Sequence, residues 1–205
     1  MDEQRRAVLT GGAAAMMSVA LAPGCGPAAA PAAAPAPPAA PPPAAAASST
    51  RPAPPPGKPG DFDFLAGTWK IQHRRLAPGT TTWDEFEGEA TCWTILGGAG
   101  SIEELRIPAR DFSGLGLRLL DRAAGVWKDH WVNGKRGALA GEGTAGGFVD
   151  GVGVFISEDV EDGKPVLYRG QWDEIGPTRC RWSQAVSRDG GVSWDDNWVM
   201  HWRRV

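Results

Sequence analysis

From Leu65 to Val205 the sequence is a succession of short runs rich in Trp, Val, Ile, Leu and Thr, and each run ends at Gly, Asp, Pro or Asn. Runs of about eight to twelve residues with regular turn residues are typical of β-strands joined by tight turns. Gly and β-branched residues interrupt every window that could hold a long helix, so we expect only one helical turn, at residues 61–65. The pattern therefore predicts an all-β fold, a single antiparallel meander that closes into a barrel of about ten strands. The expected strands lie near residues 66–76, 82–94, 100–107, 114–121, 125–133, 138–145, 148–159, 165–174, 178–187 and 193–204.

Alternation along these strands predicts which side chains point into the barrel. In the ninth expected strand, Trp182, Gln184 and Val186 share one face, and we expect that face to point inward. Residues 85, 87 and 89 of the second expected strand are all Glu, and we expect this acidic row to face water.

Composition divides the chain near residue 60. Residues 27–60 are mostly Pro and Ala, whereas all ten Trp lie beyond Gly60. A Pro/Ala run has too little apolar surface to offset the entropy of ordering, so we expect residues 27–60 to be a disordered, semi-rigid linker and residues 61–205 to be one domain. With 21 basic and 24 acidic residues and no basic stripe, the chain is not expected to bind nucleic acid.

Residues 1–26 are typical of a signal peptide, with Arg5 and Arg6 before an apolar run that is too short to be a convincing membrane span. The segment after Arg5 resembles a twin-arginine export signal. The small residues before Cys25 resemble a lipobox, which implies lipidation of Cys25 and a periplasmic or cell-envelope lipoprotein held to the membrane only by that lipid. Cleavage without lipidation, and hence simple secretion, is the alternative.

Two further features are interpreted as structural. Residues 187–194 match the Asp-box pattern S-x-D-x-G-x-S/T-W, in which the carboxylate of Asp189 is expected to organise a hairpin turn. Cys92 and Cys180 fall in strands that are not neighbours in a meander, so we expect two buried free thiols rather than a disulfide.

The abundance of Trp suggests a binding cup inside the barrel. Trp69, Trp83 and Trp194 are expected to fill the core. A ten-stranded barrel is wide enough to hold a cavity, and the predicted ligand-binding residues on its inner face are Trp131, Trp172, Trp182, Gln184 and Trp198. Such a cup suits a hydrophobic or aromatic small molecule; no metal or other cofactor is expected, and the sequence indicates no particular oligomeric state.

Several segments together resemble the bacterial family called domain of unknown function 1579. They are residues 63–69, Phe86-Glu87-Gly88, Leu96-Gly97-Gly98, Trp127 with Trp131, the Asp-box hairpin and residues 197–200. Gly67 and Trp69 at the start and Arg203-Arg204 at the end also resemble the calycin arrangement, in which a Gly-x-Trp and a C-terminal Arg meet where the barrel is sealed. The resemblance implies a calycin-like, lipocalin-like barrel over residues 61–205 and no established activity.

Three alternative functions stay open. Catalysis would need one member of Glu103-Glu104 or Asp129-His130 to act with a residue of another strand, such as His73 or His201, and no nucleophile or phosphate motif accompanies them. Some ten-stranded calycin-like barrels hold haem through a C-terminal His, but alternation places His201 on the outer face. An interaction module would instead require a large exposed apolar patch.

Overall fold

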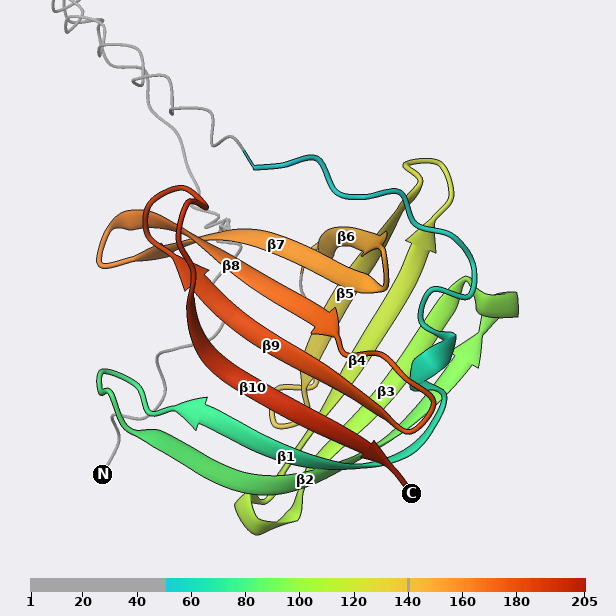
Figure 1. The fold of residues 1–205 in the computed structure, drawn as a ribbon, viewed down its shortest axis with the longest axis horizontal. Coiled ribbons are helices and arrows are strands. Elements are labelled where there is room, and N and C mark those ends of the chain that lie inside the picture. The colour runs from blue at the N-terminus through green and yellow to red at the C-terminus, as the bar shows by residue number, and fades with distance from the viewer. Residues whose placement is uncertain (1–50, 140) are drawn as a thin grey trace, which may run out of the picture.

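The computed structural model describes residues 51–139 and 141–205, so the signal segment, Cys25 and most of the Pro/Ala linker lie outside the described residues. Ten antiparallel strands form a closed barrel in which each strand pairs with its neighbours in the sequence, and β1 pairs with β10 to close the ring (Figure 1). The predicted all-β meander barrel is confirmed. The only helical elements among the described residues are three single turns of 3-10 helix.

The elements have the following bounds: η1 Asp63–Leu65, β1 Gly67–Leu76, β2 Trp83–Ile95, η2 Leu96–Gly98, β3 Gly100–Ile107, η3 Pro108–Arg110, β4 Phe112–Asp121, β5 Val126–Asn133, β6 Thr144–Val149, β7 Val152–Glu161, β8 Lys164–Asp173, β9 Arg179–Ser187 and β10 Asp195–Arg204. The expected strands match these bounds closely except for the sixth and the start of the seventh.

The sixth strand was predicted at 138–145, and this position is wrong, because β6 begins only at Thr144. The expected ranges leave Gly146-Gly147 between the sixth and seventh strands. Both glycines instead lie within β6, where an added Cβ on Gly146 would lie 2.3 Å from the ring of Phe155. The turn follows at Asp150-Gly151, both of which have positive φ. Close packing, not turn formation, is the reason for glycine in this strand.

Strand register determines the inner face. His73 is paired with Met200 and Phe86, and Trp198 is paired with Gln184, so these side chains share the inside of the barrel. Trp182 lies on the same inner face as Gln184, as alternation predicted.

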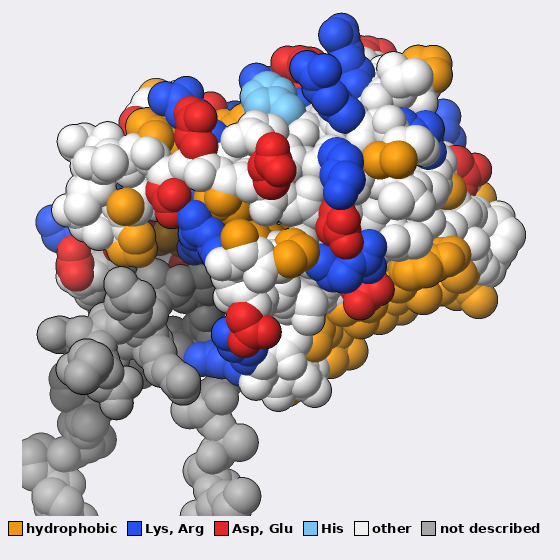
Figure 2. Space-filling model, turned by 90° about the horizontal axis from the view of Figure 1, so that it is seen from below, with side chains coloured by type: hydrophobic (Ala, Val, Ile, Leu, Met, Phe, Trp, Pro, Cys, Tyr) orange, Lys and Arg blue, Asp and Glu red, His pale blue; other side chains and the backbone are white. Residues whose placement is uncertain are grey.

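The outer face carries the acidic row. Glu85 and Glu87 are exposed, and Glu89 is half-buried because it forms ion pairs with Lys70 at 3.2 Å and Arg106 at 3.1 Å. Acidic and basic side chains are interspersed over the face shown in Figure 2, with hydrophobic side chains gathered along one edge. Exposed ion pairs of this kind each add only about 0–1 kcal/mol to stability.

One end of the barrel is closed by the N-terminal segment. The turn η1 lies inside this end (Figure 1), where Phe62 and Leu65 are fully buried. The ring of Phe62 packs edge-on against Trp127 and Phe148, both at 4.9 Å between centroids. Burial of one such apolar side chain contributes about 1.5–3 kcal/mol, which holds this segment in place. We call residues 62–65 the plug.

Arg204 seals the same end. Its guanidinium donates hydrogen bonds to the carbonyl oxygens of Phe64 and Ala66 and lies 4.2 Å above the ring of Trp69. Gly67 has a φ of +128°, and a Cβ there would lie 2.4 Å from the arginine. The expected meeting of Gly-x-Trp with the C-terminal Arg is therefore present, and Arg204 rather than Arg203 provides it.

The last residues of the expected linker lie against the barrel. Residues 51–58 contain no helix or strand, and the backbone of Gly57 donates a hydrogen bond to the carbonyl of Gly125. Gly57 also lies close to the ring of Trp127, where an added Cβ would be 2.6 Å from the nearest ring atom. The described part of the linker thus follows the barrel surface into the plug.

Candidate functional site

The opposite end of the barrel, where β1 ends and β2 begins, is the candidate site, and we call it the mouth. Inward-facing side chains at the plugged end are fully buried, such as Trp69 and Trp202. At the mouth, inward-facing Trp131, Trp182 and Trp198 remain half-buried. These side chains point into the barrel and are still partly exposed to solvent. We call this partly exposed inner surface the cup, and it is formed by Trp131, Trp182, Gln184 and Trp198.

The structure brings four of the five predicted ligand-binding residues to the cup and places the fifth below it. Trp182 and Trp198 meet edge-on with 5.7 Å between ring centroids, and Gln184 is paired with Trp198 across the strands. Trp172 is only 1% exposed and packs against Trp202, with 5.4 Å between ring centroids. It therefore lies in the buried core beneath the cup, which we call the floor.

Trp131 reaches the cup from the opposite wall, on β5. Its ring lies over Gly114 of β4, where an added Cβ would be 2.2 Å from Cζ2. Only glycine leaves room for the indole at this position. The packing of Trp131 therefore depends on Gly114, a residue that no sequence pattern marks as part of a site.

A stack of rings and guanidinium groups forms the β1–β2 side of the mouth. His73 lies parallel to Phe86 with 4.6 Å between centroids, and Arg110 covers the other face of Phe86 at 3.5 Å. Trp198 donates its indole N–H to Nδ1 of His73 at 3.2 Å, and Arg75 lies 4.4 Å from the ring of Trp198. The stack joins the η3 turn, β2, β1 and β10 into one surface.

His73 is a neutral imidazole in this setting. Burial, and after it the nearby charges of Arg110 and Arg75, lower the pKa of His73 to about 4. Its Nε2 atom has no hydrogen-bond partner among the described residues. Sequence alone offered His73 as a catalytic partner; the structure places it fully buried in the stack, with Nδ1 bonded to Trp198.

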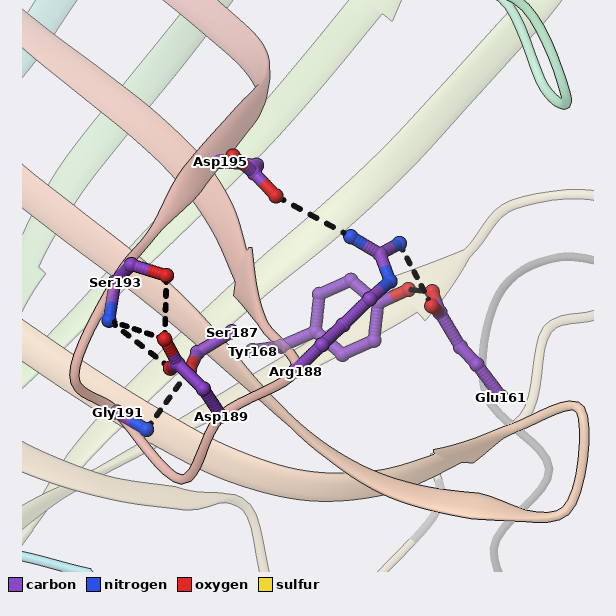
Figure 3. Close-up of polar contacts among 8 residues, drawn as sticks. All are labelled: Glu161, Tyr168, Ser187, Arg188, Asp189, Gly191, Ser193 and Asp195. Carbon is purple, nitrogen blue, oxygen red and sulfur yellow. Dashed lines mark hydrogen bonds and ion pairs between the residues drawn. The ribbon is translucent and has the colours of Figure 1, made fainter.

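The other side of the mouth is formed by polar contacts around Tyr168 and the Asp-box hairpin (Figure 3). The hydroxyl of Tyr168 donates to Glu161, and Arg188 joins Glu161 at 2.8 Å and Asp195 at 3.5 Å. Glu161 and Asp195 therefore already have partners.

Asp189 organises the turn at this rim, as its motif predicted. Its carboxylate accepts hydrogen bonds from the backbone N–H groups of Val192 and Ser193 and from the hydroxyls of Ser187 and Ser193 (Figure 3). These hydrogen bonds hold the pKa of Asp189 well below its usual range. The indole of Trp194 donates to the carbonyl of Gly191, which completes the turn.

Below the cup lies a buried ionic cluster that the sequence analysis did not single out as a unit. Arg118 on β4 bonds to Glu103 on β3 at 2.6 Å and lies 3.4 Å from Asp129 on β5. Burial acts to lower the pKa of Arg118, and the two carboxylates more than offset it. Burial also raises the pKa of Asp129 to about 6. The sequence did offer one sign of this cluster: alternation along the strand places Arg118, a charged residue, on the inner face of the barrel.

The ring nitrogens of Trp172 and Trp202 and Nη1 of Arg118 are buried and have no hydrogen-bond partner among the described residues. Unpaired buried donors are costly, so an acceptor such as a water molecule is expected among them. The thiol of Cys92 lies opposite Glu103 in the strand register, and burial followed by the charge of Glu103 raises its pKa well above the usual value, so it stays a neutral thiol. The cluster is explained by its own charge pairing.

The remaining candidates lie away from the cup. His201 is exposed on the outer face, as alternation predicted, so it does not reach a group held inside the barrel. Cys92 and Cys180 are both buried and free, and burial raises the pKa of Cys180 to about 12. Within residues 51–139 and 141–205, no group of three or more His, Cys, Asp or Glu side chains is placed to hold a metal ion, and no helix is long and apolar enough to span a membrane.

Two surface hollows lie outside the cup, and neither is lined by a predicted ligand-binding residue. One of about 510 Å³ lies between the β6–β7 turn and the β8–β9 loop at the plugged end. The other, of about 330 Å³, lies on the outside of the barrel beside Trp93, Leu115 and Val132. Trp93, beside this second hollow, is 46% exposed.

Comparisons with known proteins identify no family for this chain. No protein-family model matches the chain, and no curated protein matches it. Among solved structures, the chain is similar to a protein of unknown function from the DUF3598 family of Nostoc punctiforme, with a TM-score of 0.42 and 13% sequence identity. The similarity covers 70% of this chain and 49% of that protein, so the chain spans about half its length.

Proposed function

We propose that this protein binds a hydrophobic or aromatic small molecule in the cup of its barrel. The observation that carries the proposal is the half-buried state of inward-facing Trp131, Trp182 and Trp198 at one end of a barrel whose other end is plugged. Ligand sites are concave and mostly apolar with a few polar groups, and a single amide, that of Gln184, accompanies the three rings. Indole rings also pack favourably against flat aromatic ligands.

Binding is favoured over catalysis by the contacts that Glu103 and His73 already make. Glu103 is bonded to Arg118, and Nδ1 of His73 is bonded to Trp198. Groups held by such contacts are poorly placed to exchange protons with a substrate. The cup is left with surfaces and one amide, which suffice to hold a molecule in a defined orientation.

We further propose that the barrel works outside the cytoplasm, on a lipid anchor. The proposal is supported by Arg5-Arg6, by the small residues before Cys25 and by the Pro/Ala segment, which would hold the barrel clear of a membrane. Membership of the domain of unknown function 1579 family is likewise a proposal, and it is supported by the meeting of Gly67, Trp69 and Arg204.

Titration with the neutral dye phenylnaphthylamine tests the binding proposal, because its fluorescence rises in apolar surroundings. We expect saturable binding that also quenches the intrinsic Trp fluorescence. Gln184→Leu keeps the side-chain size while it removes the amide, so it should change the affinity for ligands that carry a polar group. The matched control is Gln72→Leu, since Gln72 is exposed on the outer face of β1.

Trp198→Phe should weaken dye binding, whereas Trp93→Phe on the outer face should leave it unchanged. A wild-type barrel that binds neither this dye nor other apolar compounds would overturn the proposal. Binding that is lost in the Trp93 variant and kept in the Trp198 variant would move the site to the outer hollow.

A further inference from the structure

The mouth of the cup carries a basic side chain whose natural partner is taken. Arg75 is the last inward-facing residue of β1, and in the strand register it lies opposite Asp84 of β2. The carboxylate of Asp84 instead bonds to Arg110 at 2.6 Å. Among the residues that the structure describes, no carboxylate forms an ion pair with Arg75.

The position of Arg75 ties it to the cup. Its guanidinium lies 4.4 Å from the ring centroid of Trp198, which lines the cup, and the side chain is half-buried. Stacking on Trp198 holds the guanidinium plane in place while leaving its N–H groups free to donate. Arg75 is therefore preorganised next to the space where a ligand is proposed to bind.

The local charge balance is positive on this side of the mouth. Arg75 and Arg110 carry two positive charges, Asp84 carries one negative charge, and His73 is neutral. Burial and then the charge of Arg110 lower the pKa of Arg75, and both arginines lower the pKa of His73. Burial is the larger cause of both shifts, and the charges of the neighbouring arginines add to it, while Asp84 acts in the opposite direction on Arg75.

The opposite side of the mouth differs. Glu161 there is engaged by Tyr168 and Arg188, and Asp195 is also paired with Arg188 (Figure 3). An anion that enters the mouth is therefore attracted toward Arg75 and not toward Arg188, whose charge is already balanced. The asymmetry would orient a ligand that has one charged end.

We propose that the ligand is an amphiphilic monoanion, with its apolar body in the cup and its anionic group bound by Arg75. This inference rests on the proposed function and adds the chemical class of the ligand. A planar anionic group such as a carboxylate or sulfonate can accept two hydrogen bonds from one guanidinium, which adds geometric specificity to charge attraction.

Two dyes of the same ring system separate the inference from the proposed function. Anilinonaphthalene sulfonate carries an anionic group that phenylnaphthylamine lacks. We expect Arg75→Gln to weaken binding of the anionic dye by about fivefold to twentyfold and to change the affinity for the neutral dye by less than about twofold. Arg74→Gln is the matched control, because Arg74 is exposed on the outer face and stacks on Trp83; it should leave both affinities unchanged.

Salt dependence and a charge-conserving variant sharpen the test. The affinity of the wild type for the anionic dye should fall with ionic strength, and this fall should be smaller in Arg75→Gln. Arg75→Lys should retain most of the salt dependence, since it keeps the charge.

The outcomes are distinct. Equal loss of both dyes in Arg75→Gln would mean that Arg75 only supports Trp198, and it would overturn the inference. Unchanged affinity for the anionic dye would overturn it as well, while the binding proposal would stand on the neutral dye. Failure of the wild type to bind either dye would overturn both this inference and the proposed binding function.

Discussion

Trp198 of β10 donates its indole N–H to Nδ1 of His73 of β1 across 3.2 Å, inside the seam where the last strand meets the first. Because an indole nitrogen can only donate, Nδ1 must be unprotonated and the ring proton must be on Nε2. The bond therefore exists only with a neutral imidazole, which agrees with the lowered pKa of His73. One contact thus links barrel closure, the cup and a titratable group.

His73 should make the stability of the barrel depend on pH. Its pKa is about 4 in the fold and about 6.5 when the chain is unfolded, so the unfolded state binds the proton more readily. The contribution is fully present above pH 6.5 and is lost as pH falls toward 4, by up to about 3 kcal/mol. Urea unfolding between pH 4 and 8 should show this slope in the wild type and a smaller one in His73→Gln.

Asp129 acts in the opposite direction over part of this range. Its pKa is raised to about 6 in the fold, so protonation of Asp129 favours the folded state as pH falls below 6. Both proteins retain Asp129, so its effect cancels when the free energy of unfolding of His73→Gln is subtracted from that of the wild type at each pH. A pH slope that is identical in the two proteins would contradict the assignment to His73.

The buried ion pair should be sensitive to loss of either partner alone. Arg118→Met leaves Glu103 buried without its partner, and we expect a loss of about 3–5 kcal/mol in the free energy of unfolding. The double variant Arg118→Met with Glu103→Gln removes both charges of this pair and should recover part of that loss, while Asp129 remains without Arg118. The measurement is urea unfolding followed by circular dichroism. If the double variant were less stable than Arg118→Met, the unpaired charge of Glu103 would not be the cause of the stability loss.

The Asp-box turn should contribute stability without contributing to binding. Asp189→Asn removes the charge that accepts hydrogen bonds from Val192 and Ser193, and we expect the melting temperature to fall by about 2–6 °C. Because the pKa of Asp189 is lowered in the fold, its contribution is present above about pH 4 and is lost as pH falls below that value.

Asp150→Asn is the control for Asp189. Asp150 also lies in a hairpin turn, with a φ of 51°, and its side chain is outside the Asp-box network. Dye binding should survive in both variants. Normal melting of the Asp189 variant with lost dye binding would assign Asp189 to the ligand site instead.

The cellular location of the protein should depend on Arg5-Arg6 and on Cys25. Replacement of Arg5 and Arg6 by Lys should leave the precursor in the cytoplasm if export uses a twin-arginine signal. Cys25→Ala should release the mature protein from the membrane fraction, as judged by cell fractionation and immunoblotting. Cofractionation of the Cys25→Ala protein with membranes, at the level of the wild type, would exclude the lipid anchor.

Local sequence determined the parts of the fold that depend on local rules. Strand positions follow from alternation and from turn residues such as Asp162-Gly163, both with positive φ, because neighbouring residues decide these conformations. The Asp-box turn was predictable for the same reason, since its hydrogen bonds join residues within four positions of Asp189. Inward parity placed Trp182, Gln184 and Trp198 correctly because a strand has a strict period of two.

Only the tertiary structure decided which distant residues meet. The sixth strand was misplaced because Gly146 is required by Phe155, a contact between strands that no local pattern contains. Arg118 between Glu103 and Asp129, and Arg75 left without Asp84, depend on the stagger of strands around the barrel. Alternation states which face a side chain takes but not its depth along the barrel axis, so burial of Trp172 in the floor and exposure of Trp198 at the mouth follow from register and from the plug at η1.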